Sequence, residues 1–162
     1  MFRSATRHFF PALLLLIVTI GCIPFTEADD ADEREAAALE ARVFDLINVY
    51  RDAQGLPPLI ANAEVAEIAR AHSEAMGAGR VPFGHDGFAD RAGQIIRDGL
   101  GTSVGENVAW NAGYRDVAGQ AFDAWIASQG HHENIVGDYT ETGIGVVRTH
   151  DGRYFLTQLF VR

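Results

Sequence analysis

Two β-rich runs near the C-terminal end of the chain constrain the fold more than any other feature. Gly143–Arg148 and Tyr154–Val161 are rich in branched and aromatic residues, and Asp151-Gly152 lies between them. An Asp-Gly pair between two such runs is a strong signal for a β-hairpin. Because Cys22 is the only cysteine, no disulfide within the chain can support this hairpin, and a packed core must do so.

The chain upstream of the hairpin is mostly helical in pattern, with apolar residues recurring at helical spacing. Four helices are predicted. The first starts near residues 29–32 and ends at Gly55. The others run from Asn62 to Gly77, from Phe88 to Asp98 and from Tyr114 to Gly130. A short strand is expected within Gly105–Trp110. Helices on both sides of a small antiparallel sheet predict an α+β sandwich.

The N-terminus has the pattern of an export signal. Arg3, Arg7 and His8 precede an almost wholly apolar run, residues 9–20, which is shorter than the roughly 20 residues of a membrane span. Residues 1–21 are therefore predicted to be a signal peptide, residues 22–35 an acidic tether, and residues 36–162 the folded domain.

Thr19-Ile20-Gly21-Cys22 is similar to a bacterial lipoprotein cleavage site, which makes Cys22 the candidate lipid attachment residue. Two alternatives stay open. The signal could be cut after Thr26-Glu27-Ala28, or Cys22 could be discarded with it. The expected location is thus the cell envelope, as a lipoprotein held to the membrane by its N-terminal lipid, or the exterior, as a secreted protein.

The charge of the chain excludes one class of partner. The formal net charge is -9, and removing Arg3 and Arg7 leaves 11 arginines against 22 acids, or -11. Nucleic-acid binding is not expected, since it requires a basic surface. Charge alone would not hold the mature chain on an anionic membrane either.

Three polar residues, His85, Glu106 and His131, are candidates for a shared site. Two imidazoles and a carboxylate could bind zinc or another divalent metal, with His85 and His131 as ligands and Glu106 as a further one. They could also perform acid–base chemistry, or be ordinary hydrogen-bonded surface residues. His72 lies on the apolar face of a predicted helix, which favours a hydrogen-bonded core histidine.

Common catalytic motifs are absent from the sequence. It contains no GxSxG nucleophile motif, no phosphate-binding loop and no HExxH metalloprotease motif, and its single cysteine lies at the export junction. Any metal would therefore depend on histidine and carboxylate ligands.

The order of short motifs resembles a bacterial CAP domain, also called the SCP domain, of the cysteine-rich secretory, antigen 5 and pathogenesis-related proteins. The resemblance covers about residues 40–162. The motifs are residues 48–59, 71–76, Phe83-Gly84-His85, residues 105–109, 125–128, 130–135, Thr142-Gly143-Ile144-Gly145 and residues 154–160.

This resemblance implies a three-layer α-β-α sandwich and a cleft with two histidines and two glutamates, which binds zinc in some members. By motif His85 and His131 are the histidines and Glu106 is the first glutamate. Ser128 stands where the second glutamate is expected. Asp123, Glu133 or Glu141 could supply a replacement carboxylate.

Three functions are compatible with these residues. The first, which the resemblance implies, is an extracellular binding module for an apolar ligand such as a sterol or fatty acid, for a protein partner of the envelope, or for a divalent metal. The second is a metal-assisted peptidase with Glu106 as general base. The third is a purely structural envelope protein. The missing nucleophile and the incomplete set of carboxylates favour binding over catalysis.

Overall fold

The computed structural model describes residues 27–162. Its helices and strands follow in the order α1 (Glu27–Ala53), β1 (Ile60–Ala61), α2 (Ala63–Gly77), α3 (Phe88–Arg97), β2 (Val104–Ala112), α4 (Val117–Ala127), α5 (Gln129–Ile135), β3 (Glu141–Arg148) and β4 (Arg153–Val161). The predicted signal peptide, residues 1–21, and Cys22 lie outside the described residues.

The predicted C-terminal hairpin is confirmed and forms the centre of the sheet. β3 and β4 pair antiparallel, and the strand order is β1-β3-β4-β2. β2 pairs antiparallel with the other side of β4, whereas the two residues of β1 pair parallel with β3. The sheet thus has one short parallel strand that the sequence pattern does not predict, because two residues cannot show a period.

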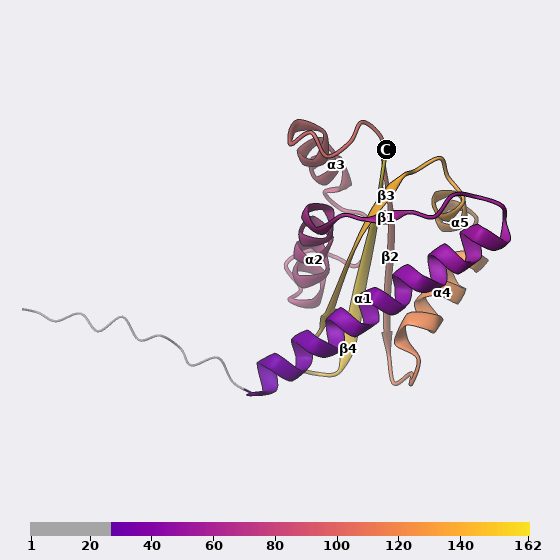
Figure 1. The fold of residues 1–162 in the computed structure, drawn as a ribbon. Helices are drawn as coiled ribbons and strands as arrows, with labels where there is room; N and C mark the ends of the chain where they lie inside the picture. Colours follow the sequence, from indigo (N-terminus) through magenta and orange to yellow (C-terminus); the bar gives the residue numbers. More distant parts are fainter. Residues whose placement is uncertain (1–26) are drawn as a thin grey trace, which may run out of the picture.

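Helices cover both faces of this sheet, so the predicted α+β sandwich is confirmed. α2 and α3 lie on one side of the strands, and α1, α4 and α5 lie on the other (Figure 1). Side chains of β4 alternate between two cores: Leu156 and Phe160 pack with α1, α4 and α5, while Leu159 and Val161 pack with α2 and α3. This alternation follows from the two-residue period of a strand.

Helix α1 begins earlier than expected. It starts at Glu27 instead of near residues 29–32, and it therefore includes residues 27–35 of the segment predicted as an acidic tether. Acidic residues suit the positive end of the helix dipole. Two of them also contact the hairpin: Arg148 Nη1 donates to Asp32 Oδ1 at 2.9 Å, and the Tyr154 hydroxyl donates to Glu35 Oε1 at 2.8 Å.

Gly130 does not end a helix as predicted. α4 ends at Ala127, and after Ser128 the chain enters α5, which contains both Gly130 and His131. His131 is therefore a helical residue and not a loop residue. Two large apolar side chains within the predicted helices are also half exposed, Ile96 at 50% and Tyr114 at 53%.

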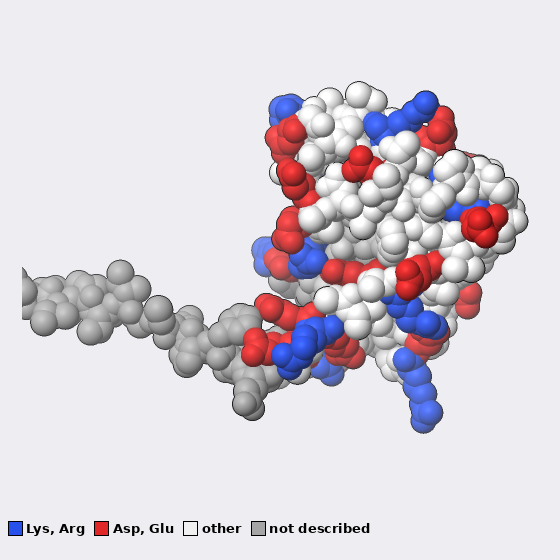
Figure 2. Space-filling model, in the orientation of Figure 1, with Lys and Arg blue, Asp and Glu red and all other residues white. Residues whose placement is uncertain are grey.

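The surface carries acids and arginines interspersed. On the face shown in Figure 2, acidic side chains border α1 and extend across the body of the domain, with arginines between them. Within residues 27–162, no helix combines the length and the apolar character needed to span a membrane.

Candidate functional site

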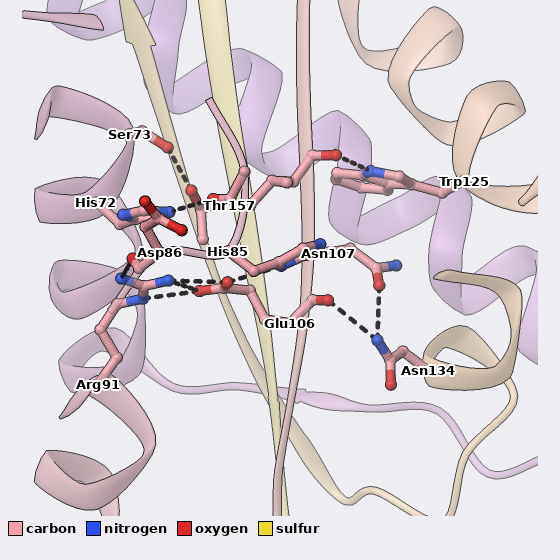
Figure 3. Close-up of polar contacts among 12 residues, drawn as sticks. His72, Ser73, His85, Asp86, Arg91, Glu106, Asn107, Trp125, Asn134 and Thr157 are labelled. Atoms are coloured by element: carbon pink, nitrogen blue, oxygen red, sulfur yellow. Dashed lines mark hydrogen bonds and ion pairs between the residues drawn. The ribbon is translucent and has the colours of Figure 1, made fainter. Parts of the chain in front are cut away.

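Three of the candidate residues, His85, Glu106 and His131, meet at β2, which lies at one end of the strand order. Successive side chains of a strand point to opposite faces. Glu106 points toward the α2–α3 layer, and Asn107 points toward α5 (Figure 3). Gly105 leaves room beside them: a Cβ there would lie 2.6 Å from the Tyr139 hydroxyl and 2.8 Å from Asn134 Oδ1, so these side chains would have to shift.

Two side chains satisfy the carbonyl groups on the outer edge of β2. Trp125 Nε1 donates to the carbonyl oxygen of Val108 at 2.9 Å, and Asn134 Nδ2 donates to that of Glu106 at 3.0 Å. An unpaired strand edge would otherwise invite pairing with another chain. These bonds attach α4 and α5 to the strand.

Asn107 attaches α5 to β2 through two hydrogen bonds. Its Nδ2 donates to the carbonyl oxygen of His131 at 3.1 Å, and its Oδ1 accepts from Asn134 Nδ2 at 2.9 Å. Asn107 is fully buried. In the Gly-Glu-Asn sequence of β2, Gly105 thus leaves space for α5 and Glu106 places a carboxylate on one face of the sheet. Asn107 holds His131 on the other face.

His85 reaches the same place from the loop between α2 and α3. Gly84 and Gly87 have φ angles of +142° and +76°, which only glycine adopts readily, so the loop follows a tight irregular path. His72 Nε2 lies 2.9 Å from the Gly84 carbonyl oxygen. His72 is 4% exposed, which confirms the prediction of a hydrogen-bonded core histidine.

The two histidines and Glu106 are brought together. His85 Nδ1 lies 2.9 Å from Glu106 Oε1, and the rings of His85 and His131 lie 5.7 Å apart between centroids. Burial, and secondarily the nearby His85, lower the pKa of His131. Burial likewise lowers the pKa of His72, with Arg91 and His85 adding to the effect while Gly84 and Glu106 oppose it.

Arg91 is the residue of this site that sequence reasoning missed. Its Nε donates to Glu106 Oε2 at 2.7 Å, its Nη2 donates to Glu106 Oε1 at 2.8 Å, and its Nη1 donates to the Asp86 carbonyl oxygen at 2.9 Å (Figure 3). The signal was present, because Arg91 is three residues from Phe88 and four from Ile95. It thus lies on the otherwise apolar stripe of α3.

The remaining candidate residues lie elsewhere or play other roles. Ser128 is the single residue between α4 and α5, and its carbonyl oxygen accepts from the His132 amide at 2.8 Å. Glu141 Oε2 accepts from Asn62 Nδ2 at 2.6 Å beside β1, at the opposite end of the sheet. Glu133 Oε1 accepts from Gln129 Nε2 along the exposed surface of α5. No bond of Asp123 to the cluster is found among residues 27–162.

This arrangement does not fit a three-ligand metal site. Among residues 27–162 no group of three or more His, Cys, Asp or Glu side chains is placed to hold one ion. Within this cluster, both oxygens of Glu106 also accept from Arg91. Zinc or another divalent metal at His85 and His131 stays a prediction.

Comparison with known proteins assigns the family. Residues 44–160 match the Cysteine-rich secretory protein family, CAP. The chain belongs to this family, and its sandwich of helices and sheet and its order of motifs agree with that assignment. The resemblance found in the sequence is thereby confirmed.

Similar proteins include two from bacilli. The chain is 32% identical over 146 residues to the uncharacterized membrane protein YlbC of Bacillus subtilis, which covers 86% of this chain and 39% of that protein. An extracellular protein containing a SCP domain from Bacillus anthracis superposes with a TM-score of 0.69 at 29% identity, over 86% of this chain and 44% of that one.

An outer surface protein of Borrelia burgdorferi shares the fold at a TM-score of 0.63 and 18% identity, over 76% of this chain and 91% of that chain. The chain spans about two fifths of the length of the curated relatives it matches, 39% and 44%.

Proposed function

We propose that this chain is an exported binding domain of the cell envelope and that it is not a hydrolase. The observation that carries the proposal is the state of Glu106, the candidate general base. Its side chain is 1% exposed and pairs with both Arg91 and His85. A general base must lie within hydrogen-bond reach of the proton that it takes. Both oxygens of Glu106 are instead bonded to Arg91, and one of them also to His85, in a position almost closed to solvent.

A hollow beside the cluster supports a small ligand with an apolar body. It measures about 530 Å³ and lies between α2 and α3. Ile68, Ala71, Ala75 and Val81 contribute apolar surface. The remaining lining is mostly polar, from Glu67, His72, Asp86, Asp90, Arg91 and Gln94. A concave site with apolar surface for the body of a ligand and polar groups that orient it is typical of small-molecule sites.

The test is binding of a fluorescent fatty acid and a fluorescent sterol by the purified mature chain. Ala71→Trp would fill the hollow, and we expect it to abolish binding. Ala89→Trp is the matched control on the exposed side of α3, and it should leave binding unchanged. The proposal fails if neither probe binds and if envelope extract also leaves nothing on the immobilised domain.

Export and attachment to the membrane form the second part of the proposal. Support comes from the basic and apolar run of residues 3–20, from Cys22 directly behind it, and from relatives described as extracellular and as a membrane protein. Metabolic palmitate labelling should mark the wild-type chain and not Cys22→Ser. An unlabelled wild-type chain would exclude the lipid anchor and leave free secretion.

A structural role is the alternative that a specific observation favours. The bonds of Arg91, His85 and Glu106 connect α3, the loop before it and β2. If the cluster serves only to connect them, His85→Ala and His131→Ala should lower the melting temperature without changing ligand binding. The peptidase alternative predicts instead that both variants abolish any hydrolysis.

A further inference from the structure

We infer that Arg91 is a built-in counter-ion that keeps Glu106 from binding a metal, so that the cluster is selective against divalent cations. This inference goes beyond the proposed function, because it concerns which cation partners Glu106 whatever ligand the domain carries. It assigns to one arginine of α3 the role of setting the chemistry of the cluster.

The bonding of Glu106 carries the inference. A guanidinium that donates through Nε to one carboxylate oxygen and through Nη2 to the other forms the planar two-bond pairing that arginine makes best. The Arg91 side chain is 13% exposed and that of Glu106 is 1% exposed, so solvent screens this pair little. His85 Nδ1 makes a third contact with the same carboxylate.

Arg91 is itself held in place. Its remaining terminal nitrogen, Nη1, donates to the Asp86 carbonyl oxygen at 2.9 Å. Coordination of a metal by Glu106 would require Arg91 to leave, and its charge would then lie mostly buried without a partner. Breaking one side of a buried ion pair is strongly unfavourable. A divalent ion therefore meets an already neutralised carboxylate and only two histidines.

The same geometry predicts what removal of Arg91 would do. Glu106 would remain buried as an uncompensated carboxylate close to His85, with the ring of His131 nearby. Two imidazoles and one carboxylate are a common ligand set of open zinc sites. Loss of one arginine should thus convert the cluster from one that rejects zinc to one that takes it up.

The experiment measures zinc binding by calorimetry and by the zinc dependence of the melting temperature. We expect Arg91→Gln to bind zinc about 10- to 100-fold more tightly than the wild type, the range in which groups next to a metal alter affinity. Zinc should raise the melting temperature of this variant and leave that of the wild type almost unchanged.

Three further variants make the result specific. The double variant Arg91→Gln with Glu106→Gln should lose the increase in zinc affinity, because the carboxylate ligand is gone. Arg97→Gln, an exposed arginine on the same helix, should behave as the wild type. Arg91→Lys keeps the charge without the two-bond pairing and should give an intermediate gain.

The inference would be overturned if the wild-type chain bound zinc as tightly as Arg91→Gln does. It would also be overturned if the gain in zinc affinity survived in the variant that combines Arg91→Gln with Glu106→Gln. If Arg91→Gln does not fold with or without zinc, Glu106→Gln in the wild-type background decides. Unchanged zinc affinity supports the inference, whereas a loss of tenfold or more would identify Glu106 as a ligand despite Arg91.

Discussion

At the scale of single residues, Arg51 does more for the fold than its charge suggests. It is 2% exposed, and its guanidinium donates to the carbonyl oxygens of Pro57, Ile135, Gly137 and Tyr139 at 2.8–3.3 Å. Burial lowers the pKa of Arg51 from its ordinary value, and Asp138 opposes this effect. One side chain of α1 thus joins the connector before β1 to the segment between α5 and β3.

We expect Arg51→Met to lower the free energy of unfolding by about 3–5 kcal/mol, because it leaves buried carbonyl groups without donors. Urea unfolding of the mature chain measures the change. Arg80→Met, at an exposed arginine after α2, is the control and should change stability by less than about 0.5 kcal/mol. Equal losses in the two variants would contradict this role of Arg51.

The histidines of the site predict a pH dependence. The pKa values of His72 and His131 are lowered by burial in the folded state, whereas in the unfolded chain they are near 6.5. Below about pH 6.5 the unfolded chain binds protons that the folded chain excludes, so acid favours unfolding. The contribution of these histidines is complete above that pH and decreases as the pH falls.

We therefore expect the free energy of unfolding to fall between about pH 7 and pH 5, before most carboxylates titrate. Urea titrations across this range measure it. His131→Gln should flatten the slope and run parallel to the wild type at higher pH. A wild-type stability that stays constant or rises toward pH 5 would refute the assignment.

At the scale of elements, the contact between α2 and β3 depends on two glycines. A Cβ on Gly143 would lie 2.2 Å from the Ala66 backbone nitrogen, and one on Gly145 would lie 2.1 Å from that of Arg70. The clash is with helix backbone, which cannot move aside as a flexible side chain can. Helix and strand can approach this closely only because neither residue has a side chain.

We expect Gly145→Ala to lower the free energy of unfolding by about 3 kcal/mol or more, at the upper end of overpacking effects. Gly130→Ala is the matched control: it lies inside α5 with no atom within 4 Å of the added Cβ. There alanine should stabilise the helix by up to about 1 kcal/mol. A Gly145→Ala variant as stable as Gly130→Ala would disprove the close approach.

The elements show why some of this structure was predictable from sequence. Local patterns were sufficient for the hairpin at Asp151-Gly152 and for Asn62, whose side chain accepts from the Val65 amide at the start of α2. The prediction that a helix ends at Gly130 was wrong. Glycine often ends helices, but Gly130 lies inside α5. The carboxylate partner of Arg91 could not be predicted, since that pair depends on the packing of α3 against β2.

At the scale of the whole molecule, the cores on the two faces share one sheet. Leu156 of β4 lies in the core with α1, α4 and α5, and Leu159, three residues later, lies in the core with α2 and α3. Both are fully buried. β4 is also the strand between β3 and β2. If the helices of one face unfolded and the sheet separated, the apolar side chains of the other core would be exposed as well.

This arrangement predicts a single cooperative unfolding transition, as in most domains of this size. Leu156→Ala and Leu159→Ala should each lower the free energy of unfolding by about 2–5 kcal/mol. Far-UV circular dichroism, which reports all helices, and tryptophan fluorescence, which reports β2 and α4 through Trp110 and Trp125, should give one midpoint in each variant. If Leu159→Ala unfolded the α2–α3 layer first, the dichroism would change at a lower urea concentration than the fluorescence, and the two faces would be separate units.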